Sequence, residues 1–150
     1  MKITDILSKE SVIADLTADS KKNLLEELAG LASKETGVDS RTILEALVER
    51  ERLGTTGVGR GVALPHTRLL GLEKIFCAFV RTNPVDFEAV DGKLVDLVFL
   101  LLVPEESGAD HLKALSCLSK LLRDETVTAT LRKAVNEDEI YQIICENDIL

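Results

Sequence analysis

The sequence has no tryptophan, and aromatic residues make up only 3% of its 150 residues. Proteins that bind single-stranded nucleic acid commonly stack bases on aromatic side chains, so this scarcity argues against that class of partner. The formal net charge of −8 also argues against binding to a phosphate backbone and favours partners with a basic face. We therefore expect no nucleic-acid partner and a core built from leucine, valine, isoleucine and alanine.

Cysteines and long apolar runs are scarce as well. The three cysteines, Cys77, Cys117 and Cys145, are odd in number and form no Cys-x-x-Cys pair, which argues against a disulfide framework and a zinc ribbon. We expect them to be buried, reduced thiols. The longest apolar run, 97–103, falls well short of the roughly 18 residues that span a membrane, and the N-terminus lacks an apolar signal region. The sequence therefore predicts a cytoplasmic protein without membrane insertion.

The spacing of apolar residues predicts a series of strands and helices. Strands are expected at 12–14, 62–64, 75–81 and 95–103, and helices at 21–36, from about 40 to 52, and three times after Gly108. The strand at 95–103 is nearly continuous in apolar residues, as expected for a strand covered on both faces. We find no repeat and no linker, so the order β-α-α-β-β-β-α-α-α predicts one α+β domain over residues 1–150. Its expected architecture is a three-layer α/β/α arrangement with helices on both faces of a mixed β-sheet.

Finer features are expected at the ends of these elements. Residues 84–87 contain turn-forming types, so we expect a turn there. Leu112 and Val135 continue the apolar stripes of two C-terminal helices and are expected to point inward. Asn136, followed three residues later by Glu139, resembles a capping box at the start of the last helix.

His66 is one of only two histidines, and its surroundings suggest more than a packed core residue. It follows Pro65, which limits the local backbone, just past the strand expected at 62–64. Glycines at 54, 57, 59 and 61 permit close backbone approach, and successive loop N–H groups can form an anion-binding concavity. Arginines at 50, 52, 60 and 68 bracket this segment. The setting predicts a place to hold a phosphoryl group; the alternatives are a packed His66 and a plain helix-to-strand connection.

His111 is the second histidine and falls in the first turn of the helix that follows the long apolar strand. If that strand runs parallel to the strand at 62–64, both end at the same edge of the sheet and His111 lies near His66. The N-terminus of a helix also favours nearby anions. The alternative is a solvated histidine at an exposed helix end.

Other chemistries find little support in the sequence. The glycine-rich segment lacks the Lys-Ser/Thr ending of a P-loop and precedes a strand rather than a helix, so it indicates neither nucleotide nor dinucleotide binding. A metal site of His66, His111 and Asp110 would lack the short ligand spacing of helical zinc motifs, and we expect no metal and no cofactor. No Gly-x-Ser-x-Gly segment indicates a serine hydrolase.

Several short motifs follow one another in a recognisable order: Arg50-Glu51, Gly-Thr-Thr-Gly-Val-Gly at 54–59, Gly-Val-Ala-Leu-Pro-His at 61–66, Leu102-Val103-Pro104, His111-Leu112 and Tyr-Gln-Ile-Ile at 141–144. In this order they resemble the enzyme IIA of the fructose, mannitol and nitrogen type, from the bacterial phosphoenolpyruvate-dependent phosphotransferase system. The resemblance extends over almost the whole chain. The glycine-rich run and the free-standing domain make the chain most similar to the nitrogen-regulatory type.

The resemblance implies roles for individual residues. His66 would accept a phosphoryl group on its Nε2 atom, Arg50 would line the site, and His111 would lie close by. The family often has glycine where this chain has Thr67, which can alter the rim of the site. The roles of Arg60 and Arg68 stay open, because these positions vary in the family.

The chemistry of phosphoryl transfer agrees with these assignments. The reaction needs an in-line nucleophile and stabilisation of charge on the equatorial oxygens. A neutral imidazole whose other nitrogen is protonated offers one lone pair, while Arg50 and His111 can balance the incoming charge. We expect further phosphate-binding groups in the loop and at its end, on Thr55, Thr56, Gly57 and Thr67.

The resemblance also implies partners. The donor would be a histidine-containing phosphocarrier protein. The output would be regulatory protein targets such as transporters or sensor kinases, or a sugar-permease component. The alternative is a non-catalytic binding domain of the same fold that regulates a transporter or kinase partner.

Overall fold

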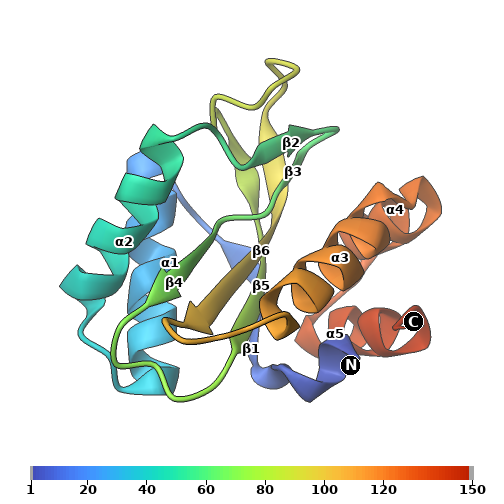
Figure 1. The fold of residues 1–150 in the computed structure, drawn as a ribbon. Coiled ribbons are helices and arrows are strands. Elements are labelled where there is room, and N and C mark those ends of the chain that lie inside the picture. Colours follow the sequence, from blue (N-terminus) through green and yellow to red (C-terminus); the bar gives the residue numbers. More distant parts are fainter. Residues whose placement is uncertain (1, 149–150) are drawn as a thin grey trace.

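A mixed sheet lies between two groups of helices, and Figure 1 shows the three layers. The computed structural model describes residues 2–148, so Met1, Ile149 and Leu150 of the expected domain lie outside the described residues. One face of the sheet is covered by α1 (Lys21–Thr36) and α2 (Ser40–Arg52), and the other by α3 (Asp110–Arg123), α4 (Glu125–Lys133) and α5 (Glu137–Glu146). The short 3-10 helix η1 (Ile3–Asp5) precedes the first strand. The expected three-layer α+β fold is confirmed.

The sheet contains β1 (Leu7–Leu16), β2 (Gly57–Gly59), β3 (Val62–Ala63), β4 (His66–Leu69), β5 (Phe76–Val85) and β6 (Val95–Pro104). The strands lie in the order β1-β5-β6-β3-β2, and β4 also pairs with β6. β6 runs antiparallel to β5 but parallel to β3 and β4, so the sheet is mixed, as expected.

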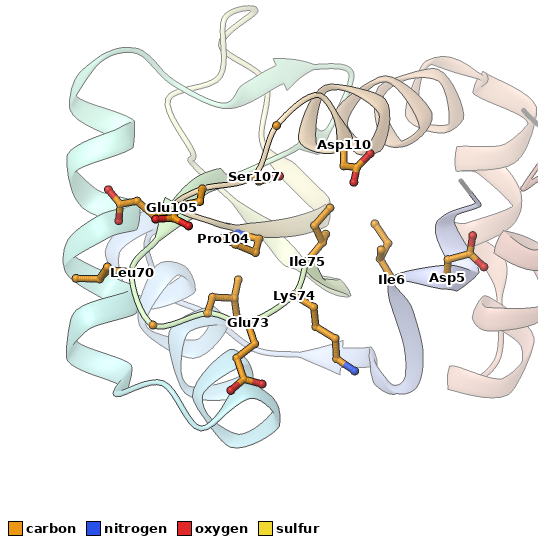
Figure 2. Close-up of a pocket in the computed structure, with 14 residues that line it drawn as sticks. Asp5, Ile6, Leu70, Glu73, Lys74, Ile75, Pro104, Glu105, Ser107 and Asp110 are labelled. Atoms are coloured by element: carbon orange, nitrogen blue, oxygen red, sulfur yellow. The ribbon is translucent and has the colours of Figure 1, made fainter.

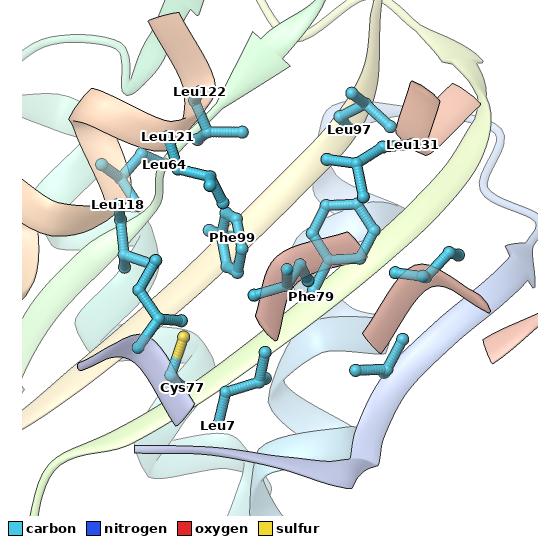
Figure 3. Close-up of a cluster of buried hydrophobic side chains, with 14 of the residues drawn as sticks. Leu7, Leu64, Cys77, Phe79, Leu97, Phe99, Leu118, Leu121, Leu122 and Leu131 are labelled. Atoms are coloured by element: carbon cyan, nitrogen blue, oxygen red, sulfur yellow. The ribbon is translucent and has the colours of Figure 1, made fainter. Parts of the chain in front are cut away.

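β6 divides the hydrophobic core into two clusters. Side chains of a strand alternate between the two faces of the sheet. Leu97 and Phe99 therefore join the cluster under α3, α4 and α5, which Figure 3 shows, while Val98 and Leu100 join the cluster under α1 and α2. In the first cluster the rings of Phe79 and Phe99 meet edge to face, with centroids 4.9 Å apart. The expectation of a strand covered on both faces is confirmed.

β3 and β4 lie end to end along the same side of β6. Val62 pairs with Leu97 and His66 with Leu101, so both strands keep one register across the interruption at 64–65. Pro65 has no N–H to donate, but its carbonyl still accepts the N–H of Leu101 at 3.0 Å. His66 therefore stands at the point where the strand pairing along this side of β6 is interrupted and resumes.

Two expectations about strands are wrong. The glycine run does not form a plain loop, because Gly57–Gly59 pairs with β3 as a short antiparallel strand. No turn interrupts the chain at Pro84, since β5 continues to Val85. Proline is tolerated there because pairing with β6 is irregular between Arg81 and Val85. His66 lies just past the strand β3, as expected, and it also begins β4.

The helices agree with expectation except at particular side chains. α1 has the expected bounds: the Ser20 hydroxyl accepts the N–H of Asn23, and Gly37 ends the helix at φ 78°. Leu112 and Val135 were expected inside but are 61% and 75% exposed. Leu112 falls outside the buried stripe of α3, and Val135 lies beyond the end of α4.

Two further expectations need correction. The Asn136 side chain caps α5 by accepting the N–H of Glu139, but the Glu139 carboxylate reaches Val135 rather than Asn136, so the reciprocal half of the capping box is missing. Among the cysteines Cys77 is buried, and burial raises the pKa of its thiol, whereas Cys145 is exposed. Within residues 2–148 no helix is both long and apolar enough to cross a membrane.

The two ends of the described chain are joined by one buried carboxylate. Asp148 accepts the N–H of Ile3 at 2.6 Å and both the N–H and the hydroxyl of Thr4, at 2.9 and 2.8 Å. This contact holds η1 against the segment that follows α5.

Candidate functional site

The imidazole of His66 is held in one orientation by the backbone two residues before it, between β3 and β4. Its Nδ1 atom lies 2.8 Å from the carbonyl oxygen of Leu64. A carbonyl oxygen only accepts hydrogen bonds, so the neutral ring carries its proton on Nδ1. The lone pair is then on Nε2, the atom available as a nucleophile.

The surroundings of His66 also favour the neutral ring. The side chain is half-buried, and burial is the largest cause of a pKa below the ordinary 6.5. The hydrogen bond to Leu64 and the charge of Glu51 raise the pKa, whereas the charges of Arg50 and His111 lower it. The net shift is downward, so near pH 7 the ring is mainly in its nucleophilic form.

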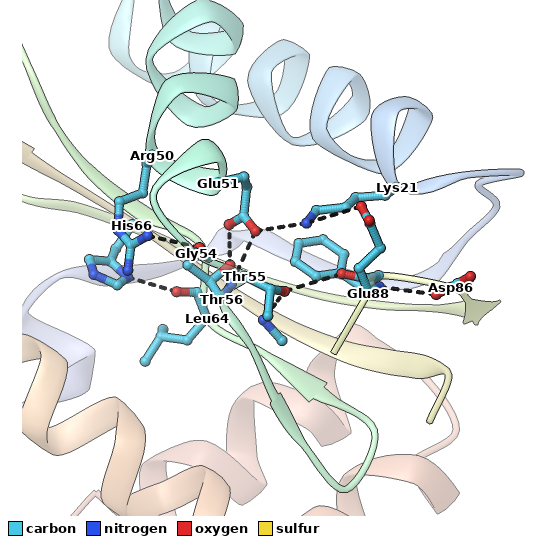
Figure 4. A network of polar contacts seen from close by, with 12 residues as sticks. Lys21, Arg50, Glu51, Gly54, Thr55, Thr56, Leu64, His66, Asp86 and Glu88 are labelled. Carbon is cyan, nitrogen blue, oxygen red and sulfur yellow. Dashed lines mark hydrogen bonds and ion pairs between the residues drawn. The ribbon is translucent and has the colours of Figure 1, made fainter. Parts of the chain in front are cut away.

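Arg50 lies beside this ring at the end of α2. Figure 4 shows its guanidinium next to the His66 imidazole. Its Nη1 atom donates to the carbonyl oxygen of Gly54 at 3.0 Å, which ties the side chain to the loop after the helix. The guanidinium has five N–H donors, so this contact leaves others for an anion. The structure thus brings together His66 and Arg50, as predicted.

His111 approaches the site from the other side. The parallel pairing of β3 and β6, on which the predicted nearness of His111 to His66 depended, is present and directs the chain after β6 toward the His66 edge. His111 Nδ1 donates to the carbonyl of Gly108 at 2.6 Å, and its charge is among those felt by His66. The two histidines therefore belong to one electrostatic site.

Arg68 was left without a role by the sequence, yet it joins this side of the site. Its Nη1 atom donates to the carbonyls of Glu105 and Ser107 at 3.0 and 2.9 Å. Its Nη2 atom lies 3.4 and 3.5 Å from the two ring nitrogens of His111, which is long for a hydrogen bond. The signal in the sequence was its place two residues after His66, since residues i and i+2 of a strand share a face.

The glycine-rich loop is bonded to the protein itself. The Thr56 N–H donates to Glu51 Oε1 at 3.0 Å and the Thr56 hydroxyl to Glu51 Oε2. Gly57 N–H donates to the hydroxyl of Thr55 at 3.1 Å, and that hydroxyl donates to the carbonyl of Phe87. These donors thus have partners inside the protein, and a phosphate-binding role for Thr55, Thr56 and Gly57 stays a prediction. Glu51 is a residue that sequence reasoning missed.

Thr67 and Gly57, two of the predicted phosphate-binding residues, make contacts within the protein that bear on their roles. The Thr67 hydroxyl donates to the carbonyl of Arg68 at 3.3 Å, and its contact with phosphate also stays a prediction. A Cβ atom at Gly57 would lie 2.9 Å from Ala89, so close packing requires glycine there. Among residues 2–148, no group of three or more His, Cys, Asp or Glu side chains is arranged to hold a metal ion.

The His66 site lies outside the pocket that opens between two neighbouring loops. A pocket of about 780 Å³ opens between the loop after β4 and the loop after β6, with Leu70, Pro104 and Asp110 among its lining residues (Figure 2). None of the predicted site residues lines it. His66 is thus presented at the side of the sheet, where a partner's surface can reach it.

Comparison with known proteins identifies the class. The sequence profile of the phosphoenolpyruvate-dependent sugar phosphotransferase system, EIIA 2, matches residues 5–147. The chain is 50% identical to the nitrogen regulatory protein of Bradyrhizobium diazoefficiens over 145 residues, or 96% of this chain and 95% of that protein. The crystal structure of nitrogen regulatory protein IIA-Ntr from Neisseria meningitidis superposes with a TM-score of 0.90 at 38% identity, covering 95% of this chain and 98% of that one.

A more distant structure shows the same fold. The mannitol enzyme IIA of Escherichia coli, solved in complex with phosphorylated enzyme IIB, superposes with a TM-score of 0.78 at 19% identity, covering 94% of this chain and 99% of that one. The fold and the comparisons together define a phosphotransferase component. The chain belongs to the EIIA 2 family of the phosphoenolpyruvate-dependent sugar phosphotransferase system. Its function is that of a phosphoryl relay in this system.

Proposed function

We propose that the protein accepts a phosphoryl group on Nε2 of His66 from a histidine-containing phosphocarrier protein. The observation that carries this proposal is the 2.8 Å contact between His66 Nδ1 and the Leu64 carbonyl, because it leaves the lone pair of the neutral ring on Nε2. A ring fixed in this way needs no proton transfer before it attacks phosphorus.

The transfer step exchanges one nitrogen–phosphorus bond for another. The bond from the carrier's imidazole to phosphorus breaks, and its electron pair returns to that imidazole. The lone pair of His66 Nε2 forms the new bond, and the Leu64 carbonyl stabilises the positive charge shared by the phosphorylated ring. Arg50 and His111 stabilise the charge on the phosphoryl oxygens.

Several features support a protein as the donor. His66 lies outside the pocket of Figure 2, so its surroundings suit a docking surface better than an enclosed small molecule. The net charge of −8 favours a partner with a basic face. The mannitol enzyme IIA of the same fold has been solved with phosphorylated enzyme IIB.

The output of the phosphorylated protein is regulatory in our proposal. The chain covers 95% of the Bradyrhizobium nitrogen regulatory protein at 50% identity. We therefore propose that its phosphorylation state acts on cytoplasmic regulatory targets such as transporters or sensor kinases.

The proposal is tested by incubating the protein with phosphoenolpyruvate, enzyme I and a phosphocarrier protein, followed by intact mass measurement. We expect the addition of a single phosphoryl group that is labile in acid and stable in base. The His111→Ala variant should still be labelled and the His66→Ala variant should not. If no carrier labels the wild type, the protein is instead a binding domain of the same fold.

A further inference from the structure

Glu51 is a buried carboxylate immediately after Arg50, near the end of α2. Only 6% of its side-chain surface is exposed. A buried carboxylate costs several kcal/mol in desolvation unless it is paired and hydrogen-bonded, so the burial of Glu51 must be compensated by specific contacts. Figure 4 shows that it stands at the centre of a polar network between α1, α2 and the glycine-rich loop.

The charge of Glu51 is matched by Lys21, the first residue of α1. Lys21 Nζ lies 2.9 Å from Glu51 Oε1 and 4.6 Å from the centre of the Phe87 ring. A second carboxylate, that of the exposed Glu88, lies 3.7 Å from the same ammonium. The Lys21 side chain is itself largely buried, so the Glu51–Lys21 pair is shielded from solvent and fixes Glu51 in place.

From Glu51 a continuous series of hydrogen bonds leads to the imidazole. The Thr56 N–H donates to Glu51 Oε1 at 3.0 Å, and the Leu64 N–H donates to the Thr56 carbonyl at 2.9 Å. The Leu64 carbonyl then accepts Nδ1–H of His66 at 2.8 Å. Three contacts thus join the carboxylate to the ring, and the last of them selects the tautomer.

The backbone of the same residue helps to hold Arg50. The carbonyl of Glu51 accepts the N–H of Gly54 at 3.1 Å, and the Gly54 carbonyl accepts Arg50 Nη1 at 3.0 Å. The side chain and the backbone of Glu51 therefore anchor both ends of the short loop at 53–56. One end of that loop leads to Arg50, and the other leads through Thr56 to His66.

We propose that Glu51 is a positioning residue for the phosphoryl-accepting imidazole. Its buried carboxylate, paired with Lys21, holds Thr56 and through it the Leu64 carbonyl, which keeps His66 protonated on Nδ1 with Nε2 open to the donor. This inference rests on the proposed function of His66, which Glu51 does not itself touch.

The test compares Glu51→Gln with Glu49→Gln. Both variants remove one carboxylate from α2, but Glu49 is exposed and pairs with Arg52 in a surface contact. The tautomer of His66 is measured by long-range proton–nitrogen NMR of the unphosphorylated protein, and the rate of phosphoryl transfer from the carrier by rapid quench. The melting temperature is measured beside them.

In Glu51→Gln we expect the Nε2–H tautomer of His66 to appear beside the Nδ1–H form. The transfer rate should fall about ten- to a hundredfold, in the range reached when a reacting group is slightly misplaced. Glu49→Gln should match the wild type in both measurements. A Glu51→Gln protein with a lower melting temperature but the wild-type tautomer and rate would overturn the proposal, because Glu51 would then be merely structural.

A second variant keeps the proposal testable if Glu51→Gln does not fold. Thr56→Val removes the hydroxyl bonded to Glu51 Oε2 but keeps the N–H bonded to Oε1. We expect a smaller shift of the tautomer and a smaller loss of rate; unchanged values for both would contradict the inference. The tautomer is read without any phosphorylation, so a failure of the proposed function, in which even the wild type accepts no phosphate, is distinguished from a failure of the role of Glu51.

Discussion

The two sides of the His66 site are built in different ways. On the α2 side, Arg50 is tied to the Gly54 carbonyl, and the loop beneath it is fixed by the buried carboxylate of Glu51. On the α3 side, the exposed Arg68 reaches across to two loop carbonyls and lies 3.4–3.5 Å from the ring of His111. The first side rests on a buried carboxylate paired with a largely buried lysine, whereas the second rests on exposed contacts.

This difference assigns different tasks to the two sides. A buried, fully bonded network resists displacement, so the α2 side sets the position of the nucleophile before a partner arrives. An exposed arginine such as Arg68 can change its partners at small cost, since surface contacts of a charged side chain contribute little free energy. The α3 side can therefore adjust when a phosphoryl group adds negative charge. Loss of a residue on the α2 side should cost more than loss of one on the α3 side.

The nucleophile lies between the two sides, and its removal should have the largest effect. We expect His66→Ala to lose all phosphorylation by the carrier while keeping the fold, because the side chain is only half-buried. Intact mass after incubation with the carrier measures the loss, and circular dichroism checks the fold. Undiminished labelling of this variant would show that another residue accepts the phosphoryl group.

Arg50 tests the strength of the α2 side. Replacement by alanine should cost about 2–4 kcal/mol of transition-state stabilisation, by analogy with the loss of one oxyanion donor. Arg50→Lys should recover only part of this, since an ammonium does not reproduce the planar fork of a guanidinium. Transfer rates by rapid quench give the answer, with Arg52→Lys as the control because Arg52 lies on the exposed surface.

The result for Arg50→Lys separates two roles. If the transfer rate of this variant equals that of the wild type, phosphoryl transfer does not need the planar guanidinium group of Arg50. Arg50 would then only stabilise the C-terminal end of α2, where a cation is favourable in any case. In that case the melting temperature, rather than the rate, should respond to Arg50→Ala.

His111 tests the α3 side and should matter less. We expect His111→Ala to fold and to slow transfer about fivefold, the value of one hydrogen bond of ~1 kcal/mol. The phosphorylated protein should also lose its phosphoryl group sooner. A transfer rate and a phosphoprotein lifetime both equal to the wild type would remove His111 from the mechanism.

The pH dependence tests how the two sides act on the ring together. Because the pKa of His66 is lowered, more than half of the rings are neutral at pH 6.5, and the midpoint of the decline in transfer rate should lie below that value. The unfolded chain takes up the proton near 6.5 while the folded ring resists it. The contribution of His66 to stability is therefore complete above 6.5 and decreases as pH falls toward the folded pKa.

An NMR titration of the His66 ring measures this pKa directly. Arg50→Gln should raise the pKa, because it removes a positive charge that lowers it. A wild-type pKa at or above 6.5 would show that burial does not control this ring. Equal pKa values in the wild type and Arg50→Gln would show that Arg50 does not act on His66 electrostatically.

Arg68 should give the smallest effect on transfer. Arg68→Gln removes the donor to the carbonyls of Glu105 and Ser107, so we expect faster amide exchange in the loop after β6 and a change in transfer rate below about threefold. Arg60→Gln is the control, since Arg60 is another exposed arginine that donates to a single carbonyl. A loss as large as that of Arg50→Ala would abolish the distinction between the two sides.

The sequence contained enough information for the layers and for part of the site. The helix at 21–36 could be bounded because Ser20 and Gly37 act locally, as a cap and as a stop. The proximity of His66 and Arg50 followed from their places around one glycine-rich segment. The proximity of His111 could be predicted only on the condition that two apolar strands run parallel, and the structure meets that condition.

The rest depended on contacts between distant parts of the chain. In the sequence, Glu51 is one charge in a charged helix end, and its burial becomes visible only when Lys21 is brought to it from another helix. The extension of β5 through Pro84 needs the bulge opposite β6, and the short strand at Gly57 needs β3 as a partner. The local sequence around each of these residues does not show the distant segment with which it pairs, and that pairing determines its structure.

The bond between the two ends of the described chain also limits the order in which the protein can form. Asp148 reaches Ile3 across 145 positions of sequence. Closing a flexible loop of that length at the outset would cost about 4 kcal/mol of chain entropy, a cost that falls once the sheet and helices between the two ends have formed. The hydrogen bonds of Asp148 to η1 therefore form only after the sheet has brought η1 and α5 together, and they break early when the protein unfolds. Their loss should speed unfolding and leave the folding rate nearly unchanged.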